Sequence, residues 1–155
     1  MKRTSGGVLV LALALVLVFA LTAGAGAAKK PQLTVVLTEF TISPLPSAET
    51  KAGTVRMKVV NKGSITHEMV LVRAASVAAL PKVTTSGGAR MVGAVDEEAI
   101  PERNKVGETG DVKPGKTVTK TFKLRPGRYV MFCNIDDATG NHFAHSMYAE
   151  FVVTK

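Results

Sequence analysis

The chain contains few of the residues that build covalent frameworks or clusters of several metal ions. Its 155 residues include one cysteine, three histidines and no tryptophan. A single cysteine excludes an internal disulfide, so Cys133 is an inert core residue, a bridge to another chain, a reactive thiol or a metal ligand. Basic residues do not form runs interleaved with aromatic side chains, which argues against nucleic-acid binding.

The first 27 residues have the pattern of a secretory signal peptide. Lys2 and Arg3 precede an uncharged apolar stretch of 14 residues, 8–21, which is shorter than the roughly 20 residues of a membrane-spanning helix. Small residues follow at 25–27 and form a suitable cleavage site. We therefore expect residues 1–27 to direct export to the periplasm or extracytoplasmic surface, with retention as an N-terminal anchor as the alternative.

Residues 28–155 are enough for one domain with one hydrophobic core, and we expect a monomer. They carry 18 basic and 12 acidic residues, a net charge of about +6 when histidine is neutral. This basicity is dispersed along the sequence, which indicates a solubilising surface. The alternative is a surface that binds an acidic partner protein or an anionic membrane.

Short apolar and β-branched runs recur between turn signals and predict strands. The six candidate strands are 33–42, 54–60, 66–72, 116–124, 127–133 and 146–154. Little convincing helix separates them, which predicts an all-β sandwich or barrel. A segment at about 74–112 interrupts the pattern, and we expect it to be a long irregular insertion.

Four residues with metal-binding side chains lie in or beside these runs: His67, Cys133, His142 and Met147. Because alternate residues face opposite sides of a sheet, His67, Cys133 and Met147 can all point into the core. A thiolate, two imidazoles and a weak axial thioether form the coordination set of a blue-copper electron-transfer site. Each residue alone is more often a core residue or a polar strand end, but the ligand types and spacing together favour one mononuclear copper site.

Three segments carry a more specific similarity: "NKGSITHEMVLV", "KPGKTVTKTFKLRPGRYVMFCNI" and "HFAHSMYAEFVV". Together they resemble the cupredoxin family, the plastocyanin, azurin and sulfocyanin-like small blue-copper proteins. The resemblance covers roughly residues 33–153 and implies a Greek-key β-sandwich with one type 1 copper ion. It also implies a role for each ligand: His67 is the remote imidazole, Cys133 the thiolate, His142 the second imidazole and Met147 the axial ligand.

The chain departs from the family pattern in the loop after Cys133. His142 lies nine positions further on, whereas the family often places its second histidine only a few residues after the cysteine. His145 is a rival ligand that the sequence alone does not exclude. Its position two residues before Met147 favours the rim of the site, and we expect the loop to persist through about His145.

The resemblance implies an extracytoplasmic one-electron carrier between protein partners, acidic or membrane-bound, and not an enzyme. In the family the solvent-facing edge of the second histidine, here His142, is the usual electron port, with Phe143 and Ala144 as an apolar docking surface. A copper-handling protein that delivers or stores the ion is the alternative. Copper enzymes with further metal centres need more histidines than the three of this chain. We expect Asn61 to shape the turn near the site and Asn134 to donate a hydrogen bond at the ligand loop.

Overall fold

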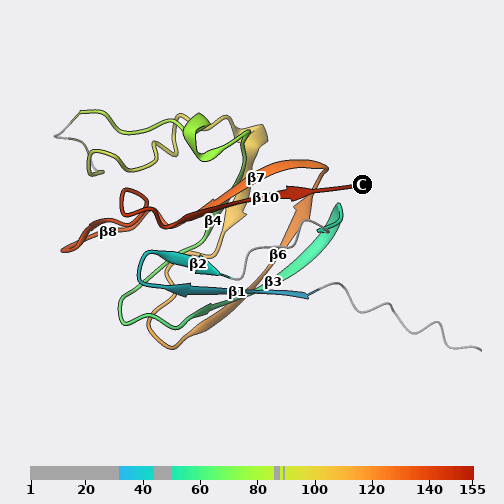
Figure 1. Cartoon of the computed structure of the whole chain (residues 1–155), viewed down its shortest axis with the longest axis horizontal. Helices are drawn as coiled ribbons and strands as arrows, with labels where there is room; N and C mark the ends of the chain where they lie inside the picture. Colours follow the sequence, from blue (N-terminus) through green and yellow to red (C-terminus); the bar gives the residue numbers. More distant parts are fainter. Residues whose placement is uncertain (1–31, 44–49, 86–87, 89) are drawn as a thin grey trace, which may run out of the picture.

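Two four-stranded sheets pack face to face in the computed structural model, which describes residues 32–43, 50–85, 88 and 90–155 (Figure 1). The first sheet has the order β2 (Thr41–Ser43), β1 (Gln32–Thr38), β3 (Gly53–Asn61) and β6 (Thr117–Leu124). The second has the order β10 (Tyr148–Val153), β7 (Gly127–Phe132), β4 (Val70–Arg73) and β5 (Lys105–Glu108). This arrangement confirms the predicted all-β sandwich, while the expected signal peptide lies outside the described residues.

The remaining elements are short. A hairpin of β8 (Asp136–Asp137) and β9 (Gly140–Asn141) lies between β7 and β10 in the sequence. Single 3-10 turns, η1 (Val77–Ala79) and η2 (Glu102–Asn104), lie in the long connection that leaves β4. Within the ranges that the structure describes, no helix is long and apolar enough to cross a membrane.

Two predicted strands differ from the structure in extent. The run 33–42 forms two antiparallel strands, β1 and β2, because the chain reverses at Glu39 and Phe40, where Phe40 has a φ of 55°. The run 66–72 becomes a regular strand only from Val70. The structure also contains β5, which was not predicted because its sequence KVGE lacks a clear apolar alternation.

The core between the sheets is built from alternate residues of both, as the period-two pattern predicts. Its members include Leu37, Met57, Val59, Leu71, Tyr129, Met131 and Phe151. A second apolar cluster joins the long connection to β4 and β7: Leu80, Val95 and Ile100 pack with Val70, Val72, Val130 and Phe132. Both faces of β4 and β7 are therefore buried, which explains their uninterrupted apolar sequences.

The strand directions define two ends of the sandwich. His67 precedes β4 and Cys133 follows the antiparallel β7, so both residues lie at one end. Arg73 and Gly127 lie at the other end, where Gln32 begins β1 alongside the first half of β3. In Figure 1 the β8–β9 hairpin marks the first end on the left, and the C-terminus lies toward the right.

Candidate metal centre

Two imidazoles and one thiol meet at the first end of the sandwich. His67, Cys133 and His142 have no exposed surface, and their ligand atoms all lie within 4.8 Å of one another. Nδ1 of His142 is 3.2 Å from Nδ1 of His67 and 3.3 Å from Sγ of Cys133. The fold thus brings together three of the four residues that the sequence singled out.

Backbone pairing and a buried asparagine hold His67 in place. The N–H of His67 donates to the carbonyl of Val112 at 3.1 Å, and the N–H of Val112 donates back at 2.7 Å. Asn61, which is fully buried, donates from Nδ2 to the carbonyls of Ile65 and Val112, both at 2.7 Å. Its Oδ1 accepts from the N–H of Gly63 at 2.8 Å. Asn61 therefore shapes the turn that carries His67, as expected from the sequence.

The ring of His67 is suited to offer a lone pair to the centre. Burial, followed by the neighbouring His142, lowers the pKa of His67, so the ring is neutral at pH 7. Two ring nitrogens 3.2 Å apart can share at most one proton. Its other nitrogen, Nε2, is the one buried side-chain nitrogen or oxygen that lacks a hydrogen-bond partner among the described residues.

Met147 is fully buried and tied through its backbone to two residues of the cluster. The N–H of Cys133 donates to the carbonyl of Met147 at 3.1 Å, and the N–H of Met147 donates to the carbonyl of His142 at 3.1 Å. The turn between His142 and Met147 includes Ser146 with a φ of 68°. The backbone of Met147 therefore lies beside the cluster, while its side chain belongs to the core between the sheets.

The Cys133 thiol is protonated at neutral pH as long as no metal ion is bound. Burial raises its pKa to about 11, although the N–H of Glu68 donates to Sγ at 3.3 Å. Burial also raises the pKa of the Glu68 carboxyl to about 7. Ligation by a thiolate consequently requires the release of a proton when the metal ion binds.

Asn134 connects the loop after β7 to the long connection. Its side chain is fully buried, and Nδ2 donates to the carbonyl of Val95 at 2.9 Å and to Oε1 of Glu97 at 2.7 Å. Its Oδ1 accepts from the N–H of Val95 at 2.9 Å, and its own N–H donates to Oε1 of Glu68 at 3.1 Å. These bonds fix the residue that follows Cys133, so Asn134 supports the ligand loop as expected.

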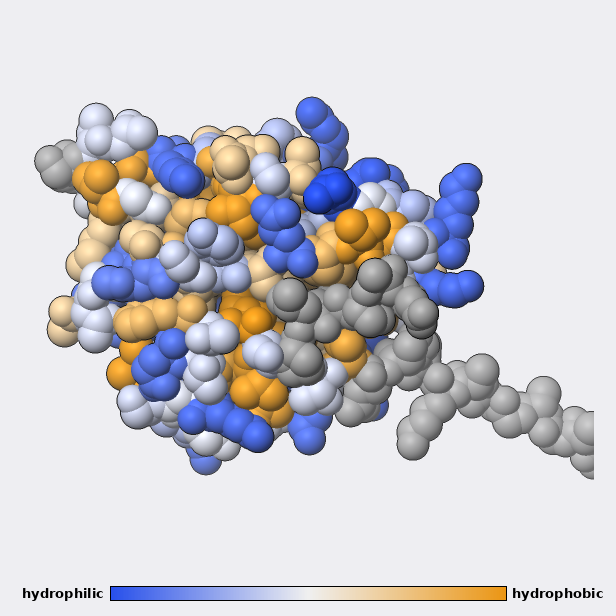
Figure 2. Space-filling view, in the orientation of Figure 1, coloured by the Kyte–Doolittle hydropathy of each residue, from blue (hydrophilic) through white to orange (hydrophobic). Residues whose placement is uncertain are grey.

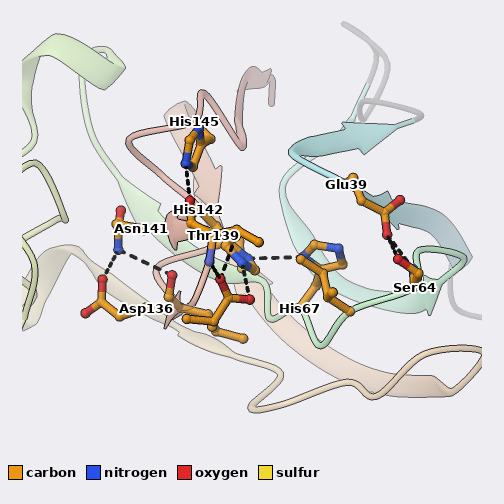
Figure 3. A network of polar contacts seen from close by, with 12 residues as sticks. Glu39, Ser64, His67, Asp136, Thr139, Asn141, His142 and His145 are labelled. Carbon is orange, nitrogen blue, oxygen red and sulfur yellow. Dashed lines mark hydrogen bonds and ion pairs between the residues drawn. The ribbon is translucent and has the colours of Figure 1, made fainter.

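The nine-residue separation between Cys133 and His142 is filled by the β8–β9 hairpin, which reaches back to the ring of His142. Oδ2 of Asp137 lies 3.1 Å from Nε2 of His142, and hydrogen bonds from Thr139 lower the pKa of Asp137. An ionised carboxylate makes Nε2 the donor, so in the neutral ring Nδ1 keeps its lone pair toward His67 and Cys133. Figure 3 shows the contact between His142 and His67.

The prediction that one edge of the His142 ring faces solvent is wrong for this chain, because the ring has no exposed surface. Asp137 covers Nε2, and the ring of Phe40 packs edge-on against the imidazole with centroids 5.4 Å apart. Phe143 is also buried, only 4% exposed, which contradicts its expected place on a docking surface, whereas Ala144 is exposed. The long loop and the β1–β2 turn therefore replace solvent at the face of His142.

His145 lies at the rim of the site and outside the cluster of ligand atoms. Its side chain is exposed, and its Nε2 lies 2.7 Å from the carbonyl oxygen of Thr139. Its ring lies against Phe40 with centroids 4.6 Å apart. The chain stays in turns through Ser146 before β10 begins, as predicted. This geometry favours His142 as the second imidazole of the cluster.

The donor atoms of the cluster fit one soft or borderline cation. All are imidazole nitrogen or thiol sulfur, and no carboxylate is among them. Such ligands select copper or zinc over magnesium and calcium, which prefer oxygen. The contact of Asp137 with His142 was not predicted from the sequence, where the unusual length of the loop is the only signal that points to it.

Known structures share this architecture, although no family model and no curated protein matches the chain. A dithionite-reduced auracyanin from the photosynthetic bacterium Roseiflexus castenholzii is 19% identical, with a TM-score of 0.56 over 81% of this chain and 98% of its own. Auracyanin B is 21% identical, with a TM-score of 0.57 over 82% and 92%. An azurin (Az-iso2) from Methylomonas sp. strain J is 17% identical, with a TM-score of 0.53 over 82% and 100%. The two sheets and these likenesses together show that the chain has the cupredoxin fold.

Proposed function

We propose that the protein binds one type 1 copper ion through His67, Cys133, His142 and Met147. The observation that carries the proposal is the convergence of two buried imidazoles and one buried thiol within 4.8 Å. The backbone bonds that join Met147 to Cys133 and His142 keep this residue beside the other three, and its thioether would be a further ligand. This donor set suits both oxidation states, because sulfur stabilises Cu(I) and imidazole binds Cu(I) and Cu(II).

The protein is then an exported one-electron carrier between redox partner proteins, with no enzymatic reaction of its own. The copper ion supplies the one-electron couple when it is bound. One auracyanin of this fold was obtained in a dithionite-reduced state, which supports redox cycling for the fold. Firm placement of His67 by Val112, and of His142 between Asp137 and Phe40, limits rearrangement of the ligands during electron transfer.

Burial of His142 moves the contact surface for partners away from the imidazole itself. Phe40 touches the rings of both the buried His142 and the exposed His145. Partners therefore approach the metal centre over Phe40, His145 and the β8–β9 hairpin. This surface is the proposed site of electron exchange.

A role in copper delivery or storage is the alternative. Such a protein must release its ion readily, whereas the ligand atoms here are buried and Nε2 of His142 is held by Asp137. Rapid loss of copper to a chelator, without a reversible redox couple, would favour this alternative.

Visible absorption and electron-paramagnetic-resonance spectra of the Cu(II) protein test the proposal directly. We expect an intense thiolate-to-copper band that disappears in Cys133→Ser and in His142→Ala, while circular dichroism shows that both variants stay folded. His145→Ala is the matched control and should keep the band. An unchanged band in Cys133→Ser would remove this residue from the site, and loss of the band only in His145→Ala would transfer the ligand role to His145.

A further inference from the structure

A cationic hollow lies at the end of the sandwich opposite the candidate metal centre. It has a volume of about 390 Å³ and is lined by Val106, Tyr129 and five basic residues, Arg73, Arg103, Lys105, Lys123 and Arg125. None of the described residues that line it is acidic. An adjoining hollow of about 310 Å³ shares Arg73 and adds Arg128. Together these six basic residues are called the cationic end.

The backbone around the hollow is firmly built. Tyr129 Oη accepts from the N–H of Arg125 at 2.9 Å and donates to the carbonyl of Arg125 at 2.7 Å. The guanidinium of Arg73 donates to the carbonyl of Pro126 at 3.0 Å. It also packs closely on Gly127, where an added Cβ would lie 2.9 Å from Nε of Arg73. The position of Arg73 is therefore set by the turn that leads into β7.

The fold gathers charges that are dispersed in the sequence. The six residues come from the end of β4, the η2–β5 segment, the end of β6 and the start of β7. One of them, Lys105, is paired with Glu102, and the other five have no ion-pair partner in the part of the chain that the structure describes. Figure 2 shows several strongly hydrophilic residues projecting at the right-hand end of the face in view. A uniform solubilising surface would not concentrate the excess charge at one end.

The chemistry of the cationic end favours phosphate groups. Arginine presents a planar fork of donors that binds phosphate oxygens in pairs, and lysine adds a mobile point charge. The chain also enters the domain at this end: Gln32 pairs with Arg56 of β3, whose first residue, Gly53, pairs with Leu124 beside Arg125. Of the two fates expected for residues 1–27, retention as an anchor would hold the apolar stretch 8–21, and with it this end of the domain, at a bilayer. A phosphate-bearing lipid surface therefore fits the hollow better than a free anion does.

We propose that the cationic end docks on the phosphate headgroups of an anionic lipid bilayer and turns the His67–Cys133–His142 end away from it. The docking depends on Arg73, Lys123, Arg125 and their basic neighbours, and does not require a bound metal ion. Each basic residue near an anionic surface adds to the attraction, which weakens as salt screens the charges.

Arginine footprinting on the full chain tests the docking. The protein is placed in bilayer discs of phosphatidylcholine with phosphatidylglycerol, or of phosphatidylcholine alone, and treated with phenylglyoxal before mass spectrometry. We expect Arg73, Arg125 and Arg128 to react more slowly in the anionic discs. Arg90, which is exposed near the metal centre, is the internal control and should react at the same rate in both.

A pair of matched variants shows whether the hollow itself is responsible. Lys123→Gln with Arg125→Gln should weaken docking roughly 30-fold, read as recovered reactivity of Arg73, because each lost basic residue weakens binding roughly fivefold. The control double variant, Lys113→Gln with Lys116→Gln, removes the same two charges just before β6 begins. It should leave Arg73 protected.

Three results would overturn the proposal. The first is equal reactivity of Arg73 in anionic and neutral discs. The second is an equal loss of protection in both double variants, which would indicate attraction by net charge alone. The third is protection of Arg73 by inorganic pyrophosphate in neutral discs without protection by phosphatidylglycerol, which would assign the hollow to a free anion.

Discussion

Replacing Asp137 with asparagine tests how the β8–β9 hairpin acts on the candidate copper ligand His142. Asparagine has one side-chain oxygen, so it can keep the hydrogen bond from Nε2 of His142 at Oδ2 but not also those from Thr139 at Oδ1, and the negative charge is lost. Asp136→Asn is a matched control, because it makes the same change one residue earlier, where the carboxylate accepts from Nδ2 of Asn141 at 2.9 Å.

The size of the effect follows from the charge at 3.1 Å. A hydrogen bond to a charged group contributes about 1.5–3 kcal/mol and a neutral one about 0.5–1.5 kcal/mol, so losing the charge costs roughly 1 kcal/mol. The Asp137 side chain is 30% exposed, and solvent screening argues against a larger value. We expect Cu(II) to bind about five- to tenfold more weakly, which only reaches the lower limit of the roughly 10–100-fold range for partners of metal-bound histidine.

The reduction potential should rise in Asp137→Asn, because the carboxylate stabilises Cu(II) more than Cu(I). If Cu(I) affinity is unchanged, a five- to tenfold loss for Cu(II) corresponds to roughly 40–60 mV. Chelator competition in each oxidation state gives the affinities, redox titration gives the potential, and ¹⁵N NMR of the copper-free protein reports the tautomer of His142. An equal rise in Asp136→Asn, or an unchanged potential and tautomer in Asp137→Asn, would refute the reasoning.

Three further predictions concern the same end of the molecule. Met147→Leu should keep copper and raise the reduction potential, because loss of the sulfur ligand destabilises Cu(II) more than Cu(I). Met131→Leu is the control, since Met131 is also fully buried. Each change should cost under about 1.5 kcal/mol of stability. Burial raises the pKa of Glu68 from 4.5 to about 7, so the folded chain holds this proton more tightly and the copper-free protein should lose stability as pH rises between those values. In urea titrations at a series of pH values, Glu68→Gln should remove roughly 2 kcal/mol of this loss of stability, a value that allows for partial solvent contact. If the free energy of unfolding keeps the same slope against pH in the variant, Glu68 is not its cause. Copper affinity should rise about tenfold per pH unit below the pKa of about 11 of Cys133, since binding displaces its proton; an affinity that is constant between about pH 7 and 8 would contradict thiolate ligation.

The cluster could be predicted because its signals are local in the sequence. Cys133, His142 and Met147 lie within one short stretch, and alternate residues of β10, namely Ala149, Phe151 and Val153, pack in the core as the period-two pattern predicts. The buried environment of His67 was also predicted, although this residue forms an isolated bridge and not a regular strand. Side-chain period and ligand type were enough for these residues because both are read from neighbouring positions.

Features that depend on distant contacts could not be predicted in the same way. Asp137 follows another aspartate in a polar loop, and only the pairing of β8 with β9 brings its carboxylate to His142. The cover that Phe40 gives to His142 requires the reversal between β1 and β2. Arg73 and Arg125 are far apart in the chain, so their shared hollow appears only when β4 and β6 are placed in space.

Shortening the long connection between β4 and β6 would not produce a smaller version of the same protein. Val95 belongs to the apolar cluster that also contains Val130 and Phe132, so its removal would open the outer face of β7 to water. The side chain of Asn134 also makes buried hydrogen bonds with the backbone of Val95 and with Oε1 of Glu97. Without these partners the Asn134 amide would be left unpaired, at a cost of about 1–3 kcal/mol. Engineers who want a minimal scaffold from this chain would therefore have to redesign β7 together with the residue that follows Cys133.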